Sequence, residues 1–419
     1  MANKSILNPT AQRIFAAWEK EGRAERPRNY LGASIVGHEC EAYLWYCFRG
    51  VVRESFDGRM YRLFDRGRRE EAVFCDDLRR LGCEVKDRDE KTGGQFAVTH
   101  FGGHFAGHLD AIARGFMEAP KTWHVCEFKT HSDASFRKLC KEGVKAAKPM
   151  HYAQMQTYMG LTGFDRAFYM AVDKDNDDLW CERIPFSKTD FDAIMARAKR
   201  IIDACEPERC ATRPDDFRCK QCACRTLCWH ESGEFVDPSV PVSCLTCCHS
   251  TAATDGEGAA WTCRLGKPCG RGMSCADHLF LPAFVGAEVR DGTKDAIRYS
   301  ASDGREFVVG KGGFSSAEIS RVSNGTLDAV LAAKRAIPGA VVEATNSIEA
   351  KFAQEDCTVV FEGSVEGLKE WCAENDYIDW AKPKMTETVG GKKYFNYADY
   401  VMVTIDGGKA VVKEMNPPF

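Results

Sequence analysis

The sequence predicts an α/β fold in which a mixed β-sheet is flanked by helices, and three stretches support this prediction. Residues 56–82 place apolar side chains at helical spacing and end at a glycine, which is typical of one long amphipathic helix. Residues 107–110 and 123–130 have apolar or β-branched residues in alternate positions around a turn-rich segment, which predicts a β-hairpin. Residues 164–173 and 179–184 alternate in the same way about an Asp-Asn-Asp turn and predict a second pair of strands.

The length and charge of the chain set limits on its organisation. With 419 residues we expect three parts: an α/β domain at 1–235, a cysteine-rich metal-binding segment at 236–284, and an α+β domain of unknown role at 285–419. The net charge of −4 gives no overall basic surface, so any contact with nucleic acid has to come from a local groove. The sequence has no run of about 18 apolar residues and no apolar signal core, which predicts a cytoplasmic protein without membrane contact.

The predicted hairpin carries a set of charged residues with a specific chemical use. Side chains two apart on a strand share a face, so Glu127 and Lys129 point to one side while Cys126 and Phe128 point to the other. With Asp110, two carboxylates and one ammonium group meet at one edge. Carboxylates suit Mg²⁺ or Mn²⁺, and a neighbouring lysine can orient or deprotonate water, which together indicate phosphodiester hydrolysis. From spacing alone, a solvated salt bridge on an exposed strand is the alternative.

Three motifs in the same order resemble those of a known superfamily. They are Gly-His-Leu-Asp ending at Asp110, Glu-Phe-Lys-Thr from Glu127, and a Gln-x-x-x-Tyr pair at Gln154 and Tyr158. Over about residues 30–230 the chain resembles the PD-(D/E)XK nucleases, in particular the branch of RecB-type and lambda-type exonucleases and the iron-sulfur nucleases of CRISPR adaptation. The resemblance implies a restriction-endonuclease-like fold, with metal bound by Asp110 and Glu127 and a catalytic Lys129. Gln154 and Tyr158 would share one face of the following helix.

Two further groups of residues extend this expectation. The long helix carries Gly67-x-x-Glu70, which resembles the family's Gly-x-x-Glu motif and implies that Glu70 lies over the active site, with Glu71 as the alternative register. A solvated charged helix face explains the same residues equally well. The lysines that follow the predicted hairpin, within residues 138–148, either contact phosphates near the metal or form a soluble face. These lysines are Lys138, Lys141, Lys145 and Lys148.

The 21 cysteines indicate metal binding, because they cluster between Cys205 and Cys275 and no signal peptide points to disulfides. A Cys-x2-Cys-x5-Cys run, together with one distant cysteine, resembles the ligand set of a [4Fe-4S] cluster in the iron-sulfur exonucleases. Those four ligands would be Cys40, Cys219, Cys222 and Cys228. Cys224 is an extra thiol, and Cys205 or Cys210 could replace the distant ligand. The family usually has an arginine two residues after that cysteine, where Ala42 stands here. A tetrahedral Zn²⁺ site from the same thiols is the alternative.

A second cysteine group fits a zinc ribbon or knuckle. Its expected Zn²⁺ ligands are Cys244, Cys247, Cys263 and Cys275, with His278 able to replace one of them. Cys248 and Cys269 are expected to be bystanders. Residues 252–260 have no apolar core of their own, so metal would be the main source of order there. Ribbons of this kind bind DNA or a protein partner.

The resemblance implies a metal-dependent DNA exonuclease in the cytosol of a bacterial host, acting in phage-like recombination or repair. Its substrate would be DNA, and a single-strand annealing protein is a further partner that the resemblance suggests. A catalytically inactive, metal-stabilised DNA-binding or scaffold protein is the alternative. Beyond residue 281 no motif indicates a function, and Gly310-Lys311-Gly312-Gly313 predicts a turn because the phosphate-binding Gly-x-x-x-x-Gly-Lys-Ser/Thr pattern is absent. Helices are expected at 327–336 and 365–374 and strands at 307–309, 401–405 and 410–412.

Overall fold

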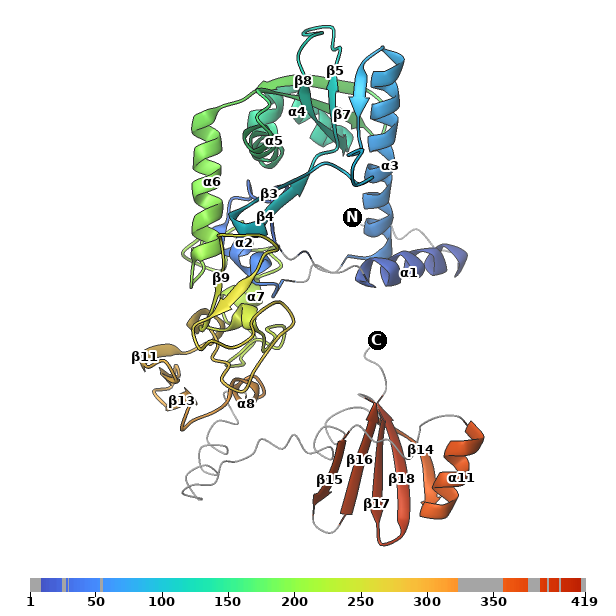
Figure 1. Cartoon of the computed structure of the whole chain (residues 1–419), viewed down its shortest axis with the longest axis vertical. Coiled ribbons are helices and arrows are strands. Elements are labelled where there is room, and N and C mark those ends of the chain that lie inside the picture. The colour runs from blue at the N-terminus through green and yellow to red at the C-terminus, as the bar shows by residue number, and fades with distance from the viewer. Residues whose placement is uncertain are drawn as a thin grey trace. The chain divides into compact units, whose positions relative to one another are not determined.

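The structure is a computed structural model that describes residues 9–24, 28, 30–52, 56–322, 357–375, 385–389, 392–398 and 401–415. The chain divides into two compact units, residues 1–325 and residues 326–419 (Figure 1). Each unit is described by itself.

A five-stranded mixed sheet forms the centre of the first unit. Its strands, in order across the sheet, are β2 (Glu84–Lys86), β5 (Ala111–Arg114), β6 (His124–His131), β7 (Arg166–Asp173) and β8 (Leu179–Pro185). The pairs β5/β6 and β7/β8 are antiparallel, whereas β6 and β7 run parallel. A parallel pair needs a crossover connection, which α4 (Asp133–Ala147) and α5 (Pro149–Thr162) supply. The mixed sheet and the predicted antiparallel pair of β7 and β8 are therefore confirmed.

One half of the predicted hairpin lies in a different sheet. Residues Phe105–His108 form β4, the middle strand of a separate three-stranded sheet. Both edges of β4 are already paired there, so the strand that pairs with β6 begins only at Ala111. Asp110 consequently lies where the chain passes from one sheet to the other. The neighbours of β4 are β1 (Leu31–Gly32) and β3 (Ala97–His100).

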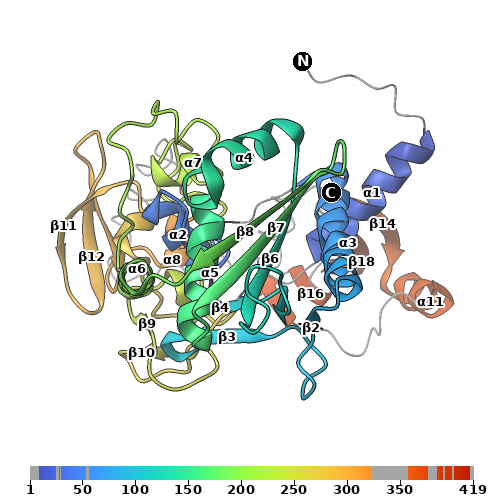
Figure 2. The same ribbon diagram turned by 90° about the horizontal axis from the view of Figure 1, so that it is seen from above.

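Helices cover both faces of the central sheet. α3 (Gly58–Arg80) lies on one face, and α4 and α5 lie on the other (Figure 2). The apolar stripe of α3 packs on β6, where the Phe74 and Phe128 rings stack with centroids 5.1 Å apart. Because strand side chains alternate, Glu127 and Lys129 point to the opposite face, toward α5. The alternation predicted from the sequence is confirmed.

Three more helices complete this part of the chain. They are α1 (Pro9–Ala24), α2 (Glu41–Phe48) and α6 (Lys188–Asp203). α1 approaches the start of α3 so closely that a Cβ atom on Gly58 would lie 1.7 Å from the Phe15 carbonyl oxygen, so only glycine fits there. α2 is joined to α6 through Glu41, which pairs with Arg197 at 3.1 Å and with Arg200 at 2.5 Å. The long helix predicted at residues 56–82 is confirmed as α3.

The chain after α6 continues the same unit with little regular structure. Its helices are α7 (Arg225–Cys228), the 3-10 helices η2 (Cys244–Thr246) and η3 (Pro282–Phe284), and α8 (Ser316–Ile319). Its strands are β9 (Ser250–Ala252), β10 (Trp261–Cys263), β11 (Glu288–Gly292), β12 (Ala296–Ser300) and β13 (Glu306–Gly310). A further 3-10 helix, η1 (Phe101–Gly103), comes earlier in the chain, between β3 and β4. The boundary expected at residue 285 is not observed. The Phe235 and Phe307 rings lie 4.7 Å apart, and the Ser316 hydroxyl donates to the His278 carbonyl at 2.7 Å. These contacts join β13 and α8 to the cysteine-rich segment, so the first unit extends to residue 325.

The β9/β10 hairpin packs against the chain that leads to Asp110. The Trp261 ring stacks on Phe48 with centroids 5.4 Å apart. Nε2 of His104, the residue before β4, lies 2.7 Å from the Ala260 carbonyl oxygen. The cysteine-rich segment is thus in contact with the same strand that precedes Asp110.

The second unit is a helix on an antiparallel sheet. Its strands, in order, are β14 (Cys357–Ser364), β18 (Lys409–Met415), β17 (Val401–Asp406), β16 (Lys392–Ala398) and β15 (Met385–Val389). α11 (Val365–Asn375) packs on this sheet through Leu368 and Cys372, which meet Val403 and Val412. The helix at 365–374 and the strands at 401–405 and 410–412 lie where the sequence predicted them. The helix predicted at 327–336 lies outside the described residues.

Candidate active site

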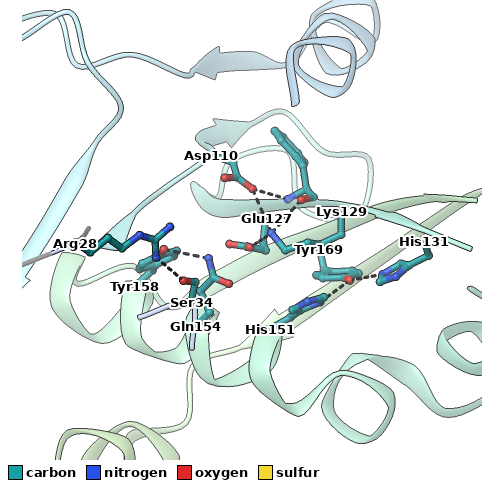
Figure 3. A network of polar contacts seen from close by, with 11 residues as sticks. Arg28, Ser34, Asp110, Glu127, Lys129, His131, His151, Gln154, Tyr158 and Tyr169 are labelled. Carbon is teal, nitrogen blue, oxygen red and sulfur yellow. Dashed lines mark hydrogen bonds and ion pairs between the residues drawn. The ribbon is translucent and has the colours of Figure 1, made fainter. Parts of the chain in front are cut away.

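Asp110 and β6 are joined by a backbone hydrogen bond. The Phe128 N–H donates to Oδ2 of Asp110 at 2.8 Å, which fixes the carboxylate over the middle of β6 (Figure 3). Nζ of Lys129 lies 3.9 Å from the same oxygen. Although Asp110 is not part of the hairpin strand, the structure brings it to Glu127 and Lys129 as the sequence predicted.

Lys129 and Glu127 form a close ion pair on the α5 side of the sheet. The Lys129 ammonium donates to Oε1 of Glu127 and to the Phe128 carbonyl, the latter at 3.1 Å. Glu127 is fully buried, and its second oxygen, Oε2, has no hydrogen-bond partner in the described part of the chain. The Lys129 side chain keeps 27% of its surface exposed. The ammonium group therefore connects a buried carboxylate to the open side of the site.

The electrostatics show an excess of negative charge in this pocket. Burial raises the pKa of Glu127 to about 8; the Lys129 ammonium opposes this shift and the Asp110 carboxylate adds to it. Burial also raises the pKa of Asp110. Burial lowers the pKa of Lys129, but the two carboxylates outweigh it, so that this pKa lies above its usual range. Two carboxylates share one ammonium in a site of low dielectric, which favours a proton or an added cation.

Helix α3 directs Glu71, rather than Glu70, toward these carboxylates. Burial and the Asp110 carboxylate raise the pKa of Glu71 to about 7, whereas the Lys129 ammonium lowers it. Glu70 instead lines a surface hollow of about 560 Å³ on another side of the helix. One residue along a helix turns the side chain by about 100°, so the expected register was wrong by one position. The hollow is also lined by Arg62, Arg66 and Arg69.

Gln154 and Tyr158 form one wall of the site. Nε2 of Gln154 donates to the Tyr158 hydroxyl at 3.0 Å, and both side chains are buried on α5 (Figure 3). Burial and the Glu127 carboxylate raise the pKa of Tyr158. A Cβ atom on Gly107 would lie 2.6 Å from the Tyr158 ring, so the glycine of the Gly-His-Leu-Asp motif is what allows β4 to pass this close. The predicted pair therefore faces the carboxylates.

Sequence reasoning missed a group of rings on the other side of Lys129. The Tyr169 hydroxyl lies between the imidazoles of His131 and His151, 2.9 Å from a nitrogen of each. A signal was present in the sequence, because His131 follows Lys129 by two residues and so shares its face of β6. Arg28, which donates to the Ser34 hydroxyl at 3.1 Å, was missed as well and lies near Tyr158 in Figure 3.

The four lysines expected near the metal separate in the structure. Nζ of Lys148 donates to Ser135 beside the His131 imidazole, so this lysine lies near the site. Lys145 instead pairs with Asp190 at 2.9 Å, on the far side of α5. Lys138 pairs with Glu142 along α4.

The first group of cysteines lines a single cavity of about 460 Å³. Its thiols are Cys40, Cys210, Cys219, Cys222, Cys224 and Cys228. Cys40 lies directly before α2, so the structure brings together the distant segment and the cysteine run after α6. Nε of Arg209 donates to Sγ of the buried Cys228 at 3.4 Å, a contact that favours the thiolate. Cys205 is not among the lining residues.

The second group contains one more thiol than expected. Burial raises the pKa of Cys269 to about 11, and the thiols of Cys244 and Cys263 add to this shift. Cys275 likewise interacts with Cys244, Cys247 and Cys263. Cys269, expected to be a bystander, therefore belongs to the group.

His278 keeps one ring nitrogen free of the turn at η2, because its buried Nδ1 has no hydrogen-bond partner among the described residues. Its Nε2 is 2.9 Å from the Ser243 carbonyl oxygen and 3.2 Å from the Thr246 hydroxyl, so it fastens the turn at η2. Across the described ranges, no three side chains of His, Cys, Asp or Glu are already grouped so that they would hold a metal ion. Small metal sites often reach their final geometry only on binding.

Comparison with known proteins gives partial structural likenesses. No family model and no curated protein matches the sequence. The solved structure of SSO0001 is similar with a TM-score of 0.32 and 15% identity, over 53% of this chain and 96% of that one. The alkaline exonuclease LHK-Exo from Laribacter hongkongensis gives 0.30 and 20%, over 45% and 89%. A phage related exonuclease from Haemophilus somnus 129PT gives 0.28 and 16%, over 41% and 91%. None of the described helices is long and apolar enough to cross a membrane.

Proposed function

We propose that this chain is a divalent-metal-dependent exonuclease that hydrolyses phosphodiester bonds of DNA. The observation that carries the proposal is the buried Oε2 of Glu127, which has no partner among the described residues although Asp110 lies beside it. An unpaired buried carboxylate oxygen is costly unless a cation compensates it. A Mg²⁺ or Mn²⁺ ion, which prefers carboxylate oxygens and keeps open positions for phosphate, fits this donor set.

The carboxylate oxygens that remain available define the ligands. Oδ2 of Asp110 is used by the Phe128 N–H, and Oε1 of Glu127 is used by Lys129. Oδ1 of Asp110 and Oε2 of Glu127 are then the oxygens that would bind the ion. When bound, the ion supplies positive charge to the phosphate oxygens of the substrate.

Lys129 contributes charge and hydrogen bonding from the protein itself. An ammonium group has three donors, and two of them are used by Glu127 and the Phe128 carbonyl. The third is free to reach the open side, where it can hold an attacking water or offset the charge of the phosphate. Gln154 and Tyr158 close the opposite wall and hold α5 against the carboxylates.

The biological setting belongs to the same proposal. A DNA exonuclease of this kind would act in recombination or repair, as in phages and bacteria, and a single-strand annealing protein would be its protein partner. The basic side chains near the site, Lys148 and Arg28, offer sequence-independent contacts to the DNA backbone.

The first group of cysteines is proposed to hold a [4Fe-4S] cluster through Cys40, Cys219, Cys222 and Cys228, with Zn²⁺ as the alternative. The donors fit, because six thiols from separate segments line one cavity and Arg209 contacts the sulfur of Cys228. The cluster would be structural and would fasten α2 to the chain after α6.

The second group is proposed to bind Zn²⁺ through Cys244, Cys247, Cys263 and Cys275. Cys269 is a fifth thiol in the group. His278 remains able to replace one of them, because its Nε2 binds the Ser243 carbonyl while its buried Nδ1 has no partner among the described residues.

The test is digestion of end-labelled linear DNA, single- and double-stranded, with Mg²⁺, Mn²⁺ or EDTA, on protein purified without oxygen. We expect shortening from the ends that requires the metal, and no digestion of closed circular DNA. Cleavage of the closed circular DNA would show that the protein is an endonuclease rather than an exonuclease. No cleavage by metal-loaded protein that still binds DNA would favour the scaffold alternative.

A further inference from the structure

Three rings next to the carboxylate pair form a hydrogen-bonded chain. The Tyr169 hydroxyl lies 2.9 Å from Nε2 of His131 and 2.9 Å from Nδ1 of His151 (Figure 3). Tyr169 is fully buried and His131 retains only 7% of its surface. Neither the metal ligands nor Lys129 needs these rings for binding, so their polar groups require another explanation.

The strand register places this chain beside Lys129. Glu127, Lys129 and His131 alternate along β6 and share one face. In the parallel pair of β6 and β7, Tyr169 lies beside Glu127 and Ala171 lies beside Lys129. The Tyr169 hydroxyl that reaches His131 must therefore pass over the small side chain of Ala171. The rings form a wall on the β7 side of Lys129, and the carboxylates lie on the other side (Figure 3).

The hydrogen bonds of the chain can all be satisfied together. Nζ of Lys148 can only donate, and it donates to Ser135, whose hydroxyl lies 3.2 Å from Nδ1 of His131. With His131 protonated on Nε2, Ser135 donates to His131, His131 donates to Tyr169, and Tyr169 donates to Nδ1 of His151; the opposite tautomers reverse this order. In either case the Tyr169 hydroxyl joins both imidazoles, so the wall is fixed as a unit.

The imidazoles of the wall are neutral. Burial lowers the pKa of His131 to about 4 and that of His151 to about 2. The ammonium groups of Lys129 and Lys148 contribute to both of these lowered pKa values, and Lys174 contributes to that of His131. A neutral wall does not repel the Lys129 ammonium and does not compete for its carboxylates.

We infer that Tyr169, held between His131 and His151, is a positioning residue that fixes the Lys129 side chain against Glu127. The inference rests on the proposed nuclease activity, in which Lys129 supplies the cation. With the β7 side closed, the ammonium turns to the carboxylates and to the open side of the site. The intact wall therefore determines the direction in which the third N–H of the Lys129 ammonium group points.

Tyr169→Phe tests the inference, because it removes one hydroxyl and keeps the ring. We expect kcat for DNA cleavage to fall about tenfold or more, since small displacements of a catalytic group are costly, while KM stays within about twofold. Tyr152→Phe is the matched control: its hydroxyl donates to Asp190 at 2.7 Å, outside the wall. An unchanged kcat in Tyr169→Phe, or an equal loss in Tyr152→Phe, would overturn the inference.

A pair of variants at His151 separates positioning from direct contact with DNA. Asparagine places an amide near the position of Nδ1, whereas leucine has no polar atom. His151→Asn should keep most of the wild-type kcat, and His151→Leu should match Tyr169→Phe. If His151→Asn is as slow as His151→Leu, the other ring nitrogen is what matters and Tyr169 does not act through this contact.

A readout without catalysis distinguishes this inference from the proposed function. The acylation rate of Lys129 by a small amine-reactive reagent, followed by peptide mass spectrometry, reports how firmly the side chain is held. We expect faster labelling in Tyr169→Phe and no change in Tyr152→Phe. Unchanged labelling would overturn the inference even for an active nuclease. Faster labelling in a protein whose wild type does not cleave DNA would refute the nuclease and still support the positioning of Lys129.

Discussion

The strands around Asp110, Glu127 and Lys129 and the cysteine-rich segment, residues 236–284, organise polar groups in opposite ways. Around Asp110 and Glu127 a paired sheet and two helix layers are complete without any ligand, and the carboxylates are placed on a rigid frame. The cysteine-rich segment has strands of only three residues and a few short turns. In the first region the packed sheet and helices position the carboxylates. In the second, the proposed metal would stabilise the folded segment, because short strands without a large core are barely stable by themselves.

The two regions nevertheless meet at one strand. The β9/β10 hairpin contacts Phe48 and His104, and His104 precedes the strand that leads to Asp110. Damage to the cysteine-rich segment can therefore reach the catalytic carboxylate through packing alone. This contact makes the comparison testable, since each region can be disturbed separately.

The largest effect is expected in the first of these regions. Lys129→Ala should reduce cleavage at least about 100-fold and leave DNA binding nearly unchanged, because this side chain acts on the water or phosphate at the site rather than on the rest of the DNA. Cleavage of end-labelled DNA and fluorescence anisotropy with an unlabelled competitor measure the two properties. Lys188→Ala is the control, since this lysine pairs with Asp192 on the surface of α6. Retained cleavage in Lys129→Ala would refute the assignment.

The opposite behaviour is expected in the cysteine-rich segment. Cys263→Ser should lose Zn²⁺ and increase proteolysis between β9 and β10, because the metal is the main source of order there. Metal analysis of the purified protein and limited proteolysis measure both effects. Cys181→Ser, at an exposed thiol of β8, should change neither. Full order in a metal-free Cys263→Ser protein would contradict the comparison.

Trp261→Ala tests whether packing transmits the effect. Trp261 is 8% exposed and stacks on Phe48, so its loss should lower the free energy of unfolding by about 3–5 kcal/mol. Urea denaturation at saturating Zn²⁺ measures the change. Trp123→Ala, which removes a ring lying against the Arg114 guanidinium, should cost less. Equal losses would show that the hairpin is not fastened through Trp261.

A smaller effect follows from the raised pKa of Glu127. Between its ordinary value of 4.5 and about 8, the folded protein keeps a proton that the unfolded chain has lost, so stability falls as pH rises through this window. Metal-free protein should therefore lose on the order of 4 kcal/mol between pH of about 5 and 8.5, and Mg²⁺ should restore much of it. Glu127→Gln should remove most of this pH dependence. A pH-independent wild type in urea denaturation would show that Glu127 is ionised throughout.

The smallest effect concerns the register of α3. Glu71→Gln should lower cleavage about tenfold, because this carboxylate interacts with Asp110, whereas Glu70→Gln should change cleavage less than twofold. The two variants differ in position by one residue and in no other respect. A larger loss of cleavage in Glu70→Gln than in Glu71→Gln would show that Glu70, as expected from the sequence, is the residue that acts at the site.

The sequence predicted which face Glu127 and Lys129 share, and it left the register open where residues of similar character stand side by side. The alternation of Glu127 and Lys129 depends only on the two-residue period of a strand. Glu70 and Glu71 cannot be separated in this way, because the helix position that faces the sheet is set by how α3 packs on Phe128.

By itself, the sequence determined the α/β class, the antiparallel pair of β7 and β8, the face shared by Glu127 and Lys129, and the existence of two cysteine groups. These features follow from local periodicity and spacing, which act over a few residues. Only the tertiary structure decided that Asp110 lies between two sheets, that residues up to 325 belong to the first unit, and that Tyr169 reaches His131 past Lys129. Such features depend on contacts between residues far apart in the chain, and local pattern does not encode which of the compatible surfaces will meet.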